Sequence, residues 1–436
     1  MKTRKVLISL SWVVFFFSPL CIALSHFFSP YGGILTLLKY LGVCFFSMLL
    51  LFYKGALRIP LGAIPVLIYA IWVVGLTVSS PSFVQADQVV RFQVIPIVMC
   101  LLVILAVRLS EEELVGVVDR SAHFMVIVLW LSIIVGLVEI VYQPILTIIY
   151  KMSIEQLGHA QTAIGRRLLS IYLNPINFGA ALCLGVVAWS YIIPVRGWFK
   201  QSIFWGGVLV CLVMVALTLS RTSLLTCLIV VFFISMARYG FKAFKYWVLL
   251  SGIFVSVFLY YVASFLSLDE VLQRFSVLTS LSTYLENERV HNWSSGVSRI
   301  DSGFDLLFGL GAGVSNPDGH MAVSHGTIIV ENAFLSNFFD FGLLGAFLYV
   351  CVHCRYVYLA FRLRVRKAMI FFVFFYVGYL FFCLTNDFNR NQPFSFYFWF
   401  FMGMLEAFSV SKKAGAYCEY TVLSPGASIT SRVGRI

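Results

Sequence analysis

The chain has 436 residues, of which 61% are hydrophobic and 11% are charged, and its formal net charge is +12. Soluble domains carry about 45–50% apolar and about 25% charged residues, so this composition excludes a soluble enzyme, a disordered chain and a nucleic-acid-binding module. The class that remains is an all-α, polytopic integral membrane protein, in which each spanning helix needs about 20 apolar residues.

Apolar runs, bounded by charged residues or by Gly, Pro and Asn clusters, predict about twelve transmembrane helices. In chain order the runs are 6–24, 34–53, 59–78, 89–107, 121–142, 171–193, 203–219, 221–237, 246–265, 333–354, 369–384 and 394–410. When both termini are placed in the cytoplasm, every short cytoplasmic loop carries Lys or Arg, and most of the 31 basic residues fall on that side. We therefore expect both termini in the cytoplasm, and the net charge requires no nucleic-acid partner.

The predicted spans divide the chain into four parts. Residues 1–265 contain helices one to nine with a medium external loop near 143–170, residues 266–331 form a large and mainly helical external loop, residues 332–410 contain helices ten to twelve, and residues 411–436 are expected to be a disordered cytoplasmic tail. Within the large loop, an amphipathic stretch from Trp293 to Leu307, with Asn292 as its N-cap, precedes a glycine-rich segment. Long loops of this kind tend to carry function.

Lys and Arg prefer the cytoplasmic loops of membrane proteins, so the cations on the predicted outer side need another explanation. Arg221 lies between two apolar runs, where an arginine costs at least about 2.5–3.5 kcal/mol unless it faces a wet or anionic cavity. It is either a snorkelling residue in a tight turn or a cation that binds phosphate in the bidentate manner of arginine. Arg166 and Arg167 are likewise either an interfacial anchor or an anion site. Arg390 lies in the polar stretch 386–392, for which we expect a solvated loop.

The end of the large loop carries the groups suited to acid–base chemistry. Three alternating glycines from Gly309 are followed by His320, His325, Glu331 and Asn332. No strand–helix context supports a nucleotide loop, and the histidine spacing does not suit a metal, so neither a metal nor a cofactor is predicted. Glu331 is either a dipole partner of the helix that follows or, like the histidines, a candidate general base.

These segments resemble the O-antigen polymerase and O-antigen ligase superfamily of membrane proteins. The similarity lies in short motifs and in their order relative to the spans: Arg167 with Asn174, Pro175 and Asn177; Ser220-Arg221-Thr222; Arg289 with Trp293, followed by Gly309, Gly311 and Gly313; and Asn332 with Leu335, Gly342 and Gly345. Many of the ligases have a histidine before the asparagine of the last motif, where this chain has Glu331, and this difference favours a polymerase.

The resemblance implies a metal-independent glycosyltransferase without a cofactor, at the periplasmic face of the bacterial inner membrane. Its donor would be an undecaprenyl-diphosphate-linked oligosaccharide, and its product an O-antigen, capsular or exopolysaccharide chain. The implied catalytic residues are Glu331, His325, His320 and Arg221, and the implied substrate-binding residues are Arg166, Arg167, Arg221, Arg289, Asn332 and Arg390. Preorganised arginines suit the negative charge that develops on a diphosphate leaving group.

Two alternatives to a polymerase stay open. An O-antigen ligase would transfer the glycan to lipid A–core, and a transporter or flippase would move the lipid-linked oligosaccharide without bond chemistry. A flippase is expected to carry charges along a central path, whereas the main intramembrane candidates in this sequence are Lys39, Arg91 and Glu139. The expected partners are the lipid-linked glycan, the lipid bilayer, and a chain-length regulator and a flippase of the same pathway.

Overall fold

Helices make up most of the computed structural model, which describes residues 2–28, 31–52, 61–78, 80, 82–142, 145–150, 161–162, 165–193, 197–240, 252, 288–316 and 327–421. Within this part, nine helices are long and apolar enough to cross a membrane. These are Thr3–Phe27, Gly32–Phe52, Phe83–Ala106, Glu111–Val141, Pro175–Ile192, Trp198–Leu217, Arg221–Tyr239, Ala333–Phe361 and Arg366–Thr385. The helical, membrane-spanning class predicted from composition is thereby confirmed.

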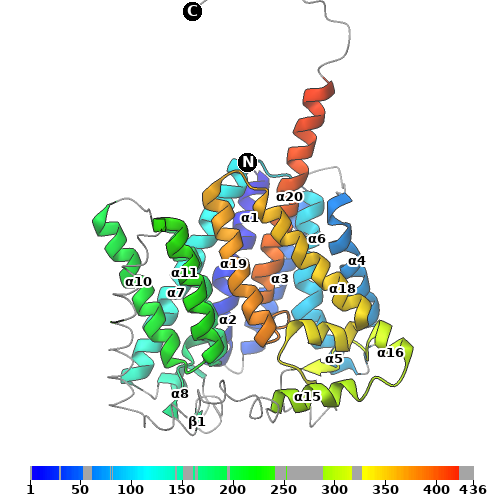
Figure 1. The fold of residues 1–436 in the computed structure, drawn as a ribbon, viewed down its shortest axis with the longest axis horizontal. Coiled ribbons are helices and arrows are strands. Elements are labelled where there is room, and N and C mark those ends of the chain that lie inside the picture. The colour runs from blue at the N-terminus through cyan, green and yellow to red at the C-terminus, as the bar shows by residue number, and fades with distance from the viewer. Residues whose placement is uncertain are drawn as a thin grey trace, which may run out of the picture.

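The individual elements follow one another as shown in Figure 1. The N-terminal helices are α1 (Lys2–Trp12) and α2 (Ser18–Phe27), joined by a π-helical segment (Val13–Phe17), then α3 (Gly32–Phe52), α4 (Ile64–Thr77), α5 (Phe83–Val89) and α6 (Ile95–Ala106). The middle helices are α7 (Glu111–Val141), α8 (Ile145–Tyr150), α9 (Pro175–Ile192), α10 (Trp198–Leu217) and α11 (Arg221–Tyr239). The last helices are α15 (Glu288–Val297), α16 (Gly303–Phe308), α18 (Ala333–Phe361), α19 (Arg366–Thr385) and α20 (Phe394–Thr421). Strand β1 (Gln161–Thr162) pairs antiparallel with β2 (Gly165–Arg166), and β3 (Ser315–Asn316) pairs parallel with β4 (Ile328–Ile329).

The observed helices coincide with the predicted spans along the chain. A shorter apolar helix, Leu61–Thr77, occupies the third predicted span, and α20 begins where the twelfth was predicted. The ninth predicted span, 246–265, lies outside the described residues apart from Gly252, so the total of about twelve stays a prediction. Helix α20 continues to Thr421, which means that the segment predicted as a disordered tail begins as helix.

Local sequence explains where the long helices begin. Ser110 and Glu113 form a capping box at the start of α7, in which the Glu113 amide donates to Ser110 Oγ at 3.2 Å and the Ser110 amide donates to the Glu113 carboxylate at 3.1 Å. Asn174 caps α9 by accepting from the Ile176 amide at 2.8 Å, and Pro175 is its first residue, where a missing amide hydrogen costs nothing.

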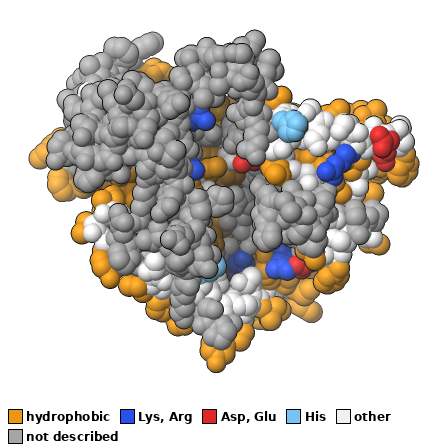
Figure 2. All heavy atoms as spheres, turned by 90° about the horizontal axis from the view of Figure 1, so that it is seen from below, with side chains coloured by type: hydrophobic (Ala, Val, Ile, Leu, Met, Phe, Trp, Pro, Cys, Tyr) orange, Lys and Arg blue, Asp and Glu red, His pale blue; other side chains and the backbone are white. Residues whose placement is uncertain are grey.

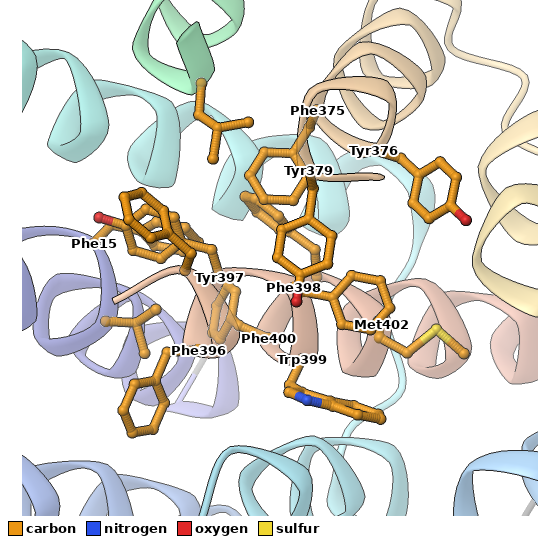
Figure 3. Packing of buried hydrophobic residues seen from close by; sticks show 14 of the residues in the cluster. Phe15, Phe375, Tyr376, Tyr379, Phe396, Tyr397, Phe398, Trp399, Phe400 and Met402 are labelled. Atoms are coloured by element: carbon orange, nitrogen blue, oxygen red, sulfur yellow. The ribbon is translucent and has the colours of Figure 1, made fainter. Parts of the chain in front are cut away.

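The core is centred on α20, whose residues 396–405 are apolar on every side because other helices surround them. Its aromatic side chains are fully buried, and the ring of Phe398 stacks on Tyr379 of α19 with centroids 4.8 Å apart. Figure 3 shows how Phe15 from the π-helical segment packs beside Tyr397 in this cluster. Helix α3, by contrast, exposes a row of large apolar side chains, as expected of a lipid-facing helix: Ile34, Leu37, Leu38, Leu41, Phe45 and Met48.

The two ends of the helix bundle differ in character. The N-terminus and the C-terminal half of α20 lie at one end, and α8, β1, α15 and α16 lie at the other, which we call the loop end (Figure 1). The described N-terminal residues of α1 and the C-terminal half of α20 share an end; that both termini face the cytoplasm stays a prediction. The amphipathic stretch of the large loop forms two helices, α15 and α16, and Asn292 lies inside α15, so its prediction as an N-cap was wrong. Ser302, paired with Asp305 in a capping box, starts α16 instead.

Candidate functional site

Two of the predicted substrate-binding cations belong to one local structure at the loop end. The Arg167 Nε donates to the carbonyl oxygen of Thr218 at 3.0 Å, and the Leu168 amide donates to that of Leu217 at 3.2 Å. The segment that starts at Arg167 therefore lies against the turn between α10 and α11. Arg221 is the first residue of α11, half-buried, and Ser220 is the N-cap immediately before it.

A buried carboxylate from α7 also holds this segment. Glu139 accepts hydrogen bonds from the amides of Leu169 at 3.3 Å and Ser170 at 2.9 Å. The Ser170 hydroxyl donates to the carbonyl oxygen of Ser132 at 2.6 Å, and the backbone of Ser170 has a φ of 50°, which is left-handed. Hydrogen bonds to a charged acceptor are among the stronger ones, so the irregular segment after Arg167 is firmly seated between α7 and α10.

The loop between α19 and α20, residues 386–393, is the centre of the loop end, and we call it the hub loop. Its residues Asn386 to Arg390 are all buried, so the prediction of a solvated loop was wrong. The physical reason is that its polar side chains bridge the ends of several helices. On the α9 side, Asn391 and Asn177 exchange two amide hydrogen bonds, at 2.6 and 3.1 Å.

Arg390 connects the hub loop to α18 and to the glycine-rich segment. Its guanidinium forms an ion pair with Asp340 of α18 and donates to the carbonyl oxygen of Ser315. The Asp340 carboxylate also accepts from the amides of Gly313 at 2.6 Å and Ser315 at 2.8 Å. These two amides of the glycine-rich segment thus bind a carboxylate of the chain itself. The guanidinium of Arg390, which we predicted to bind substrate, is held by groups of the protein.

A second carboxylate of the hub loop completes this network. Asp387 Oδ2 accepts from the Ser336 hydroxyl at 2.6 Å, and the Ser336 and Ser315 hydroxyls lie 2.7 Å apart. Arg390 Nε lies 3.5 Å from the same Asp387 oxygen. Burial raises the pKa of the Asp387 carboxyl above its ordinary value, and the charge of Arg390 opposes that shift.

The hub loop also binds the intramembrane lysine of α3. Lys39 is buried and donates to the side-chain oxygen of Gln392, and the Gln392 amide donates to the Tyr40 hydroxyl at 2.8 Å and to the Arg91 carbonyl oxygen at 3.0 Å. One loop thereby joins α3, α9, α18 and a second π-helical segment, Val90–Val94, which carries Arg91.

In the motifs that resemble the polymerase and ligase superfamily, glycine allows close backbone packing. Helix α18 is broken at Gly342, whose φ is 70°, and a Cβ there would overlap the carbonyl oxygen of Leu307 at the end of α16. The break leaves carbonyl groups of α18 without helical partners. The Leu310 amide donates to the carbonyl oxygen of Phe339 at 2.7 Å, and Trp72 Nε1 donates to that of Phe341 at 3.1 Å. Gly342 therefore lets the end of α16 lie directly against the backbone of α18.

Glu331 and Asn332 lie at the start of α18, next to the hub loop. Asn332 caps α18 by accepting from the Phe334 amide at 2.9 Å, and its own side-chain amide donates to the carbonyl oxygen of Leu384 at 2.7 Å. Glu331 is partly exposed. Asn332 thus acts on the fold, and the carboxylate before it stands at the positive end of the α18 dipole.

Four candidates are not described at the level of their side chains. His320 and His325 lie outside the described residues, and Arg166 in β2 and Arg289 in α15 are described by their backbone alone. Their predicted roles stay predictions.

Sequence reasoning overlooked two buried carboxylates within the spans. Asp340 and Glu406 are fully buried, and Glu406 forms an ion pair with Arg355 at 2.5 Å near the end opposite the loop end. A signal was present, because an ionisable residue inside an apolar run is by default a candidate functional residue. Within the described residues, no group of three or more His, Cys, Asp or Glu side chains could hold a metal ion.

Among the described side chains seen from the loop end, hydrophobic ones lie along much of the outline, and the visible Lys and Arg side chains lie inward of them (Figure 2). Comparison with known protein families and with curated proteins finds no match to this chain. The arrangement of its own residues therefore has to support any functional conclusion.

Proposed function

We propose that this chain is a Wzy-type polysaccharide polymerase that joins undecaprenyl-diphosphate-linked repeat units in the bacterial inner membrane. The loop end would face the periplasm, and both termini would face the cytoplasm. An acceptor sugar hydroxyl attacks the anomeric carbon of the donor sugar. The bond from that carbon to the diphosphate breaks, and the lipid diphosphate leaves with the bonding electron pair.

One observation carries the proposal: Arg167 Nε lies 3.0 Å from the carbonyl oxygen of Thr218, in the turn that leads directly into Arg221. Two cations from separate segments thus belong to one seated structure at the end where a lipid diphosphate would lie. Arginine suits a diphosphate because its planar guanidinium binds two oxygens at once. Charge on the leaving group develops in the transition state, so groups held in place beforehand stabilise it without reorganising.

The arrangement of the other segments adds support. The pieces that resemble the polymerase and ligase superfamily are far apart in sequence, yet contacts with the hub loop and with the end of α19 bring several of them together. Asn177 of the sixth predicted span contacts Asn391, and Arg390 contacts Ser315 and Asp340. Asn332, which opens α18, contacts the end of α19.

We assign the acceptor proton to Glu331, because its carboxylate precedes α18 beside this network and is partly exposed. His320 and His325 remain the alternative bases. Arg390 is assigned to the fold, since its guanidinium is paired with Asp340, so the diphosphate is assigned to Arg167, Arg221 and Arg289.

The test is a deletion strain complemented with variants, with surface polysaccharide resolved on a gel. A polymerase deletion leaves single repeat units on the acceptor. Arg221→Lys and Glu331→Gln should each reproduce that pattern at normal protein level. The matched controls are Arg362→Lys and Glu112→Gln, exposed residues outside the loop end, which should give full-length polymer.

The same gel separates the alternatives. Full-length chains that accumulate on the lipid carrier without attachment would identify a ligase, and repeat units stranded on the inner leaflet would identify a flippase. Normal polymer in Arg221→Ala cells would remove that arginine from the mechanism.

A further inference from the structure

Helix α16 exposes a group of large apolar side chains at the loop end. Phe304, Leu306 and Leu307 are 67%, 43% and 50% exposed, and they are three of the six residues of this helix. Single exposed apolar residues are common on proteins, but several on one short element mark a surface that another apolar body covers. Helix α16 lies at the edge of the bundle, beside α18 (Figure 1), so this surface faces the surroundings of the protein.

A stack of rings connects α16 with the apolar helix α4. Phe304 stacks on Phe308 with ring centroids 4.5 Å apart, and Phe308 stacks on Trp72 of α4 with centroids 5.4 Å apart. Helix α4 ends at the loop end, where Ser80 Oγ donates to a carbonyl oxygen of the glycine-rich segment at 2.6 Å. Trp72 lies five residues before the end of α4, which corresponds to about 7 Å along the helix axis. Val78, the next residue after α4, is apolar and 88% exposed, so the apolar surroundings of α4 extend to its end and include the level of the ring stack.

The exposed face of α16 continues the outward-facing apolar surface of its neighbours. The backbone of Leu307 lies against Gly342, and Leu343, the next residue of α18, is 53% exposed. Ile71, the residue before Trp72 in α4, is 64% exposed. Each of these two contacts of α16 with the bundle therefore lies directly beside a side chain that faces lipid. The same lipid can cover all three helices, whereas a soluble partner would have to displace it.

The backbone of α16 is suited to surroundings with little water. The Ser302 amide donates to the Asp305 carboxylate at 3.1 Å, and the Asp305 amide donates to Ser302 Oγ at 3.1 Å. At the other end, the Gly309 amide donates to the carbonyl oxygen of Asp305 at 2.8 Å. Backbone polar groups near lipid have to be paired within the protein, and the capping box meets this requirement at the start of the helix.

We propose that α16 is an interfacial anchor, in which Phe304, Leu306 and Leu307 contact the acyl chains of phospholipids in the leaflet at the loop end. Residues 300–308 contain two aspartates and no Lys or Arg, so attraction to anionic headgroups does not hold this helix in place. Its partner is the apolar part of the bilayer, and neutral phospholipids are sufficient.

The anchor fixes the position of the glycine-rich segment relative to the bilayer. This segment begins at Gly309, directly after α16, and its Gly313 amide donates to Asp340, which pairs with Arg390 of the hub loop. Lipid contact at α16 thereby reaches the centre of the loop end through two residues. The inference does not depend on the proposed function, because it concerns only how α16 meets the membrane.

The direct test is photocrosslinking of the full-length protein in phosphatidylcholine vesicles, with p-benzoylphenylalanine in place of Phe304. This analogue resembles Phe in shape and reacts with the C–H bonds that it touches. We expect mass spectrometry of the intact protein to show the added mass of a phospholipid. The analogue at Leu343 should give the same adduct, and at Ser294, an exposed polar residue of α15, it should give none.

Two results of this experiment would overturn the inference. One is a Phe304 variant without a lipid adduct while the Leu343 variant forms one. The other is a Phe304 variant that crosslinks to a second copy of the chain instead of to lipid.

Reaction with a membrane-impermeant maleimide supplies an independent measurement. In vesicles, Phe304→Cys should react at least about ten-fold more slowly than Ser294→Cys, because apolar surroundings suppress the reactive thiolate. The rate is that of labelling beyond the wild type, whose exposed Cys354 also reacts. In SDS the two variants should react equally, which controls for the reactivity of each thiol. Equal rates in vesicles would show that Phe304 faces water and would overturn the inference.

Discussion

Replacing Arg390 by Gln would test whether the hub loop holds the loop end together. The Arg390 side chain is 6% exposed and that of its partner Asp340 is 0% exposed. Removing one member of a buried ion pair leaves the other charge uncompensated, which costs about 3–5 kcal/mol. The carbonyl oxygen of Ser315 also loses its donor, so Arg390→Gln should lie toward the upper part of that range.

The assay is unfolding of the purified protein in mixed micelles with increasing SDS, followed by tryptophan fluorescence. The control is Asp87→Asn, which breaks an exposed ion pair within one helix, with side chains that are 47% and 30% exposed. Exposed pairs of this spacing contribute about 0.3–0.5 kcal/mol, so the control should unfold almost as the wild type does. Arg390→Lys should be intermediate, because it keeps the charge but cannot donate to two acceptors in the same geometry.

A double substitution makes the reasoning refutable. Adding Asp340→Asn to Arg390→Gln removes the carboxylate charge that Arg390→Gln leaves uncompensated. The double variant should therefore lose at least about 1 kcal/mol less unfolding free energy than the sum of the losses in the two single variants. The role of this ion pair in stability would be contradicted by either of two results. One is that the losses of the two single variants add up to the loss of the double variant, and the other is that Arg390→Gln is as stable as the Asp87→Asn control.

Three further predictions concern other parts of the loop end. Gly342→Ala should lower the stability by at least about 1–2 kcal/mol, because a φ of 70° is strained for other residues and the added Cβ would overlap the backbone of α16. Gly206→Ala, whose Cβ would meet open space, should raise the stability by about 0.5–1 kcal/mol, and thermal unfolding compares the two variants. Burial raises the pKa of Asp387 in the folded state, so its protonated form favours folding, and that contribution is lost as pH rises from the ordinary value of 3.8 through the raised value. The wild-type Tm should therefore fall over this window relative to Asp387→Asn, and parallel Tm profiles would contradict a raised pKa at Asp387. Glu139→Gln replaces a charged acceptor by a neutral one for two backbone amides and should cost about 1–2 kcal/mol, measured by the same SDS titration, with a reduced polymer yield on the gel.

The helices of this protein could be predicted from sequence because each span is a continuous apolar run with a recognisable start. Asn174 before Pro175 and Asn332 before an apolar run are both N-caps in the structure. These signals are local, since a cap acts on amides two or three residues away. The positions of the described helices follow from such signals without any knowledge of tertiary structure.

The hub loop could not be predicted, because its polarity is equally compatible with a solvated loop and with a buried one. Whether such a loop is buried depends on whether its polar side chains find hydrogen-bond partners. The partners of Arg390, Asn391 and Gln392 lie in distant parts of the chain: Asp340, Ser315, Asn177, Lys39, Tyr40 and Arg91. Asp340 was nevertheless visible as a carboxylate within a predicted span. A carboxylate in a span and an arginine in a neighbouring external loop are a pair worth testing before either is assigned to substrate.

Measuring both stability and polymer yield distinguishes cations that stabilise the fold from cations that bind substrate. Arg390 is neutralised by Asp340, so replacing it with Lys should lower stability, and activity should fall only as far as the folded fraction does. Arg221 follows an N-cap and begins a helix that other contacts already position, so Arg221→Lys should leave the unfolding free energy within about 0.5 kcal/mol of the wild type while polymer is lost. If the two variants behaved alike, in stability and in polymer, the assignment of Arg221 to the diphosphate would fail and the outer cations would share a structural role.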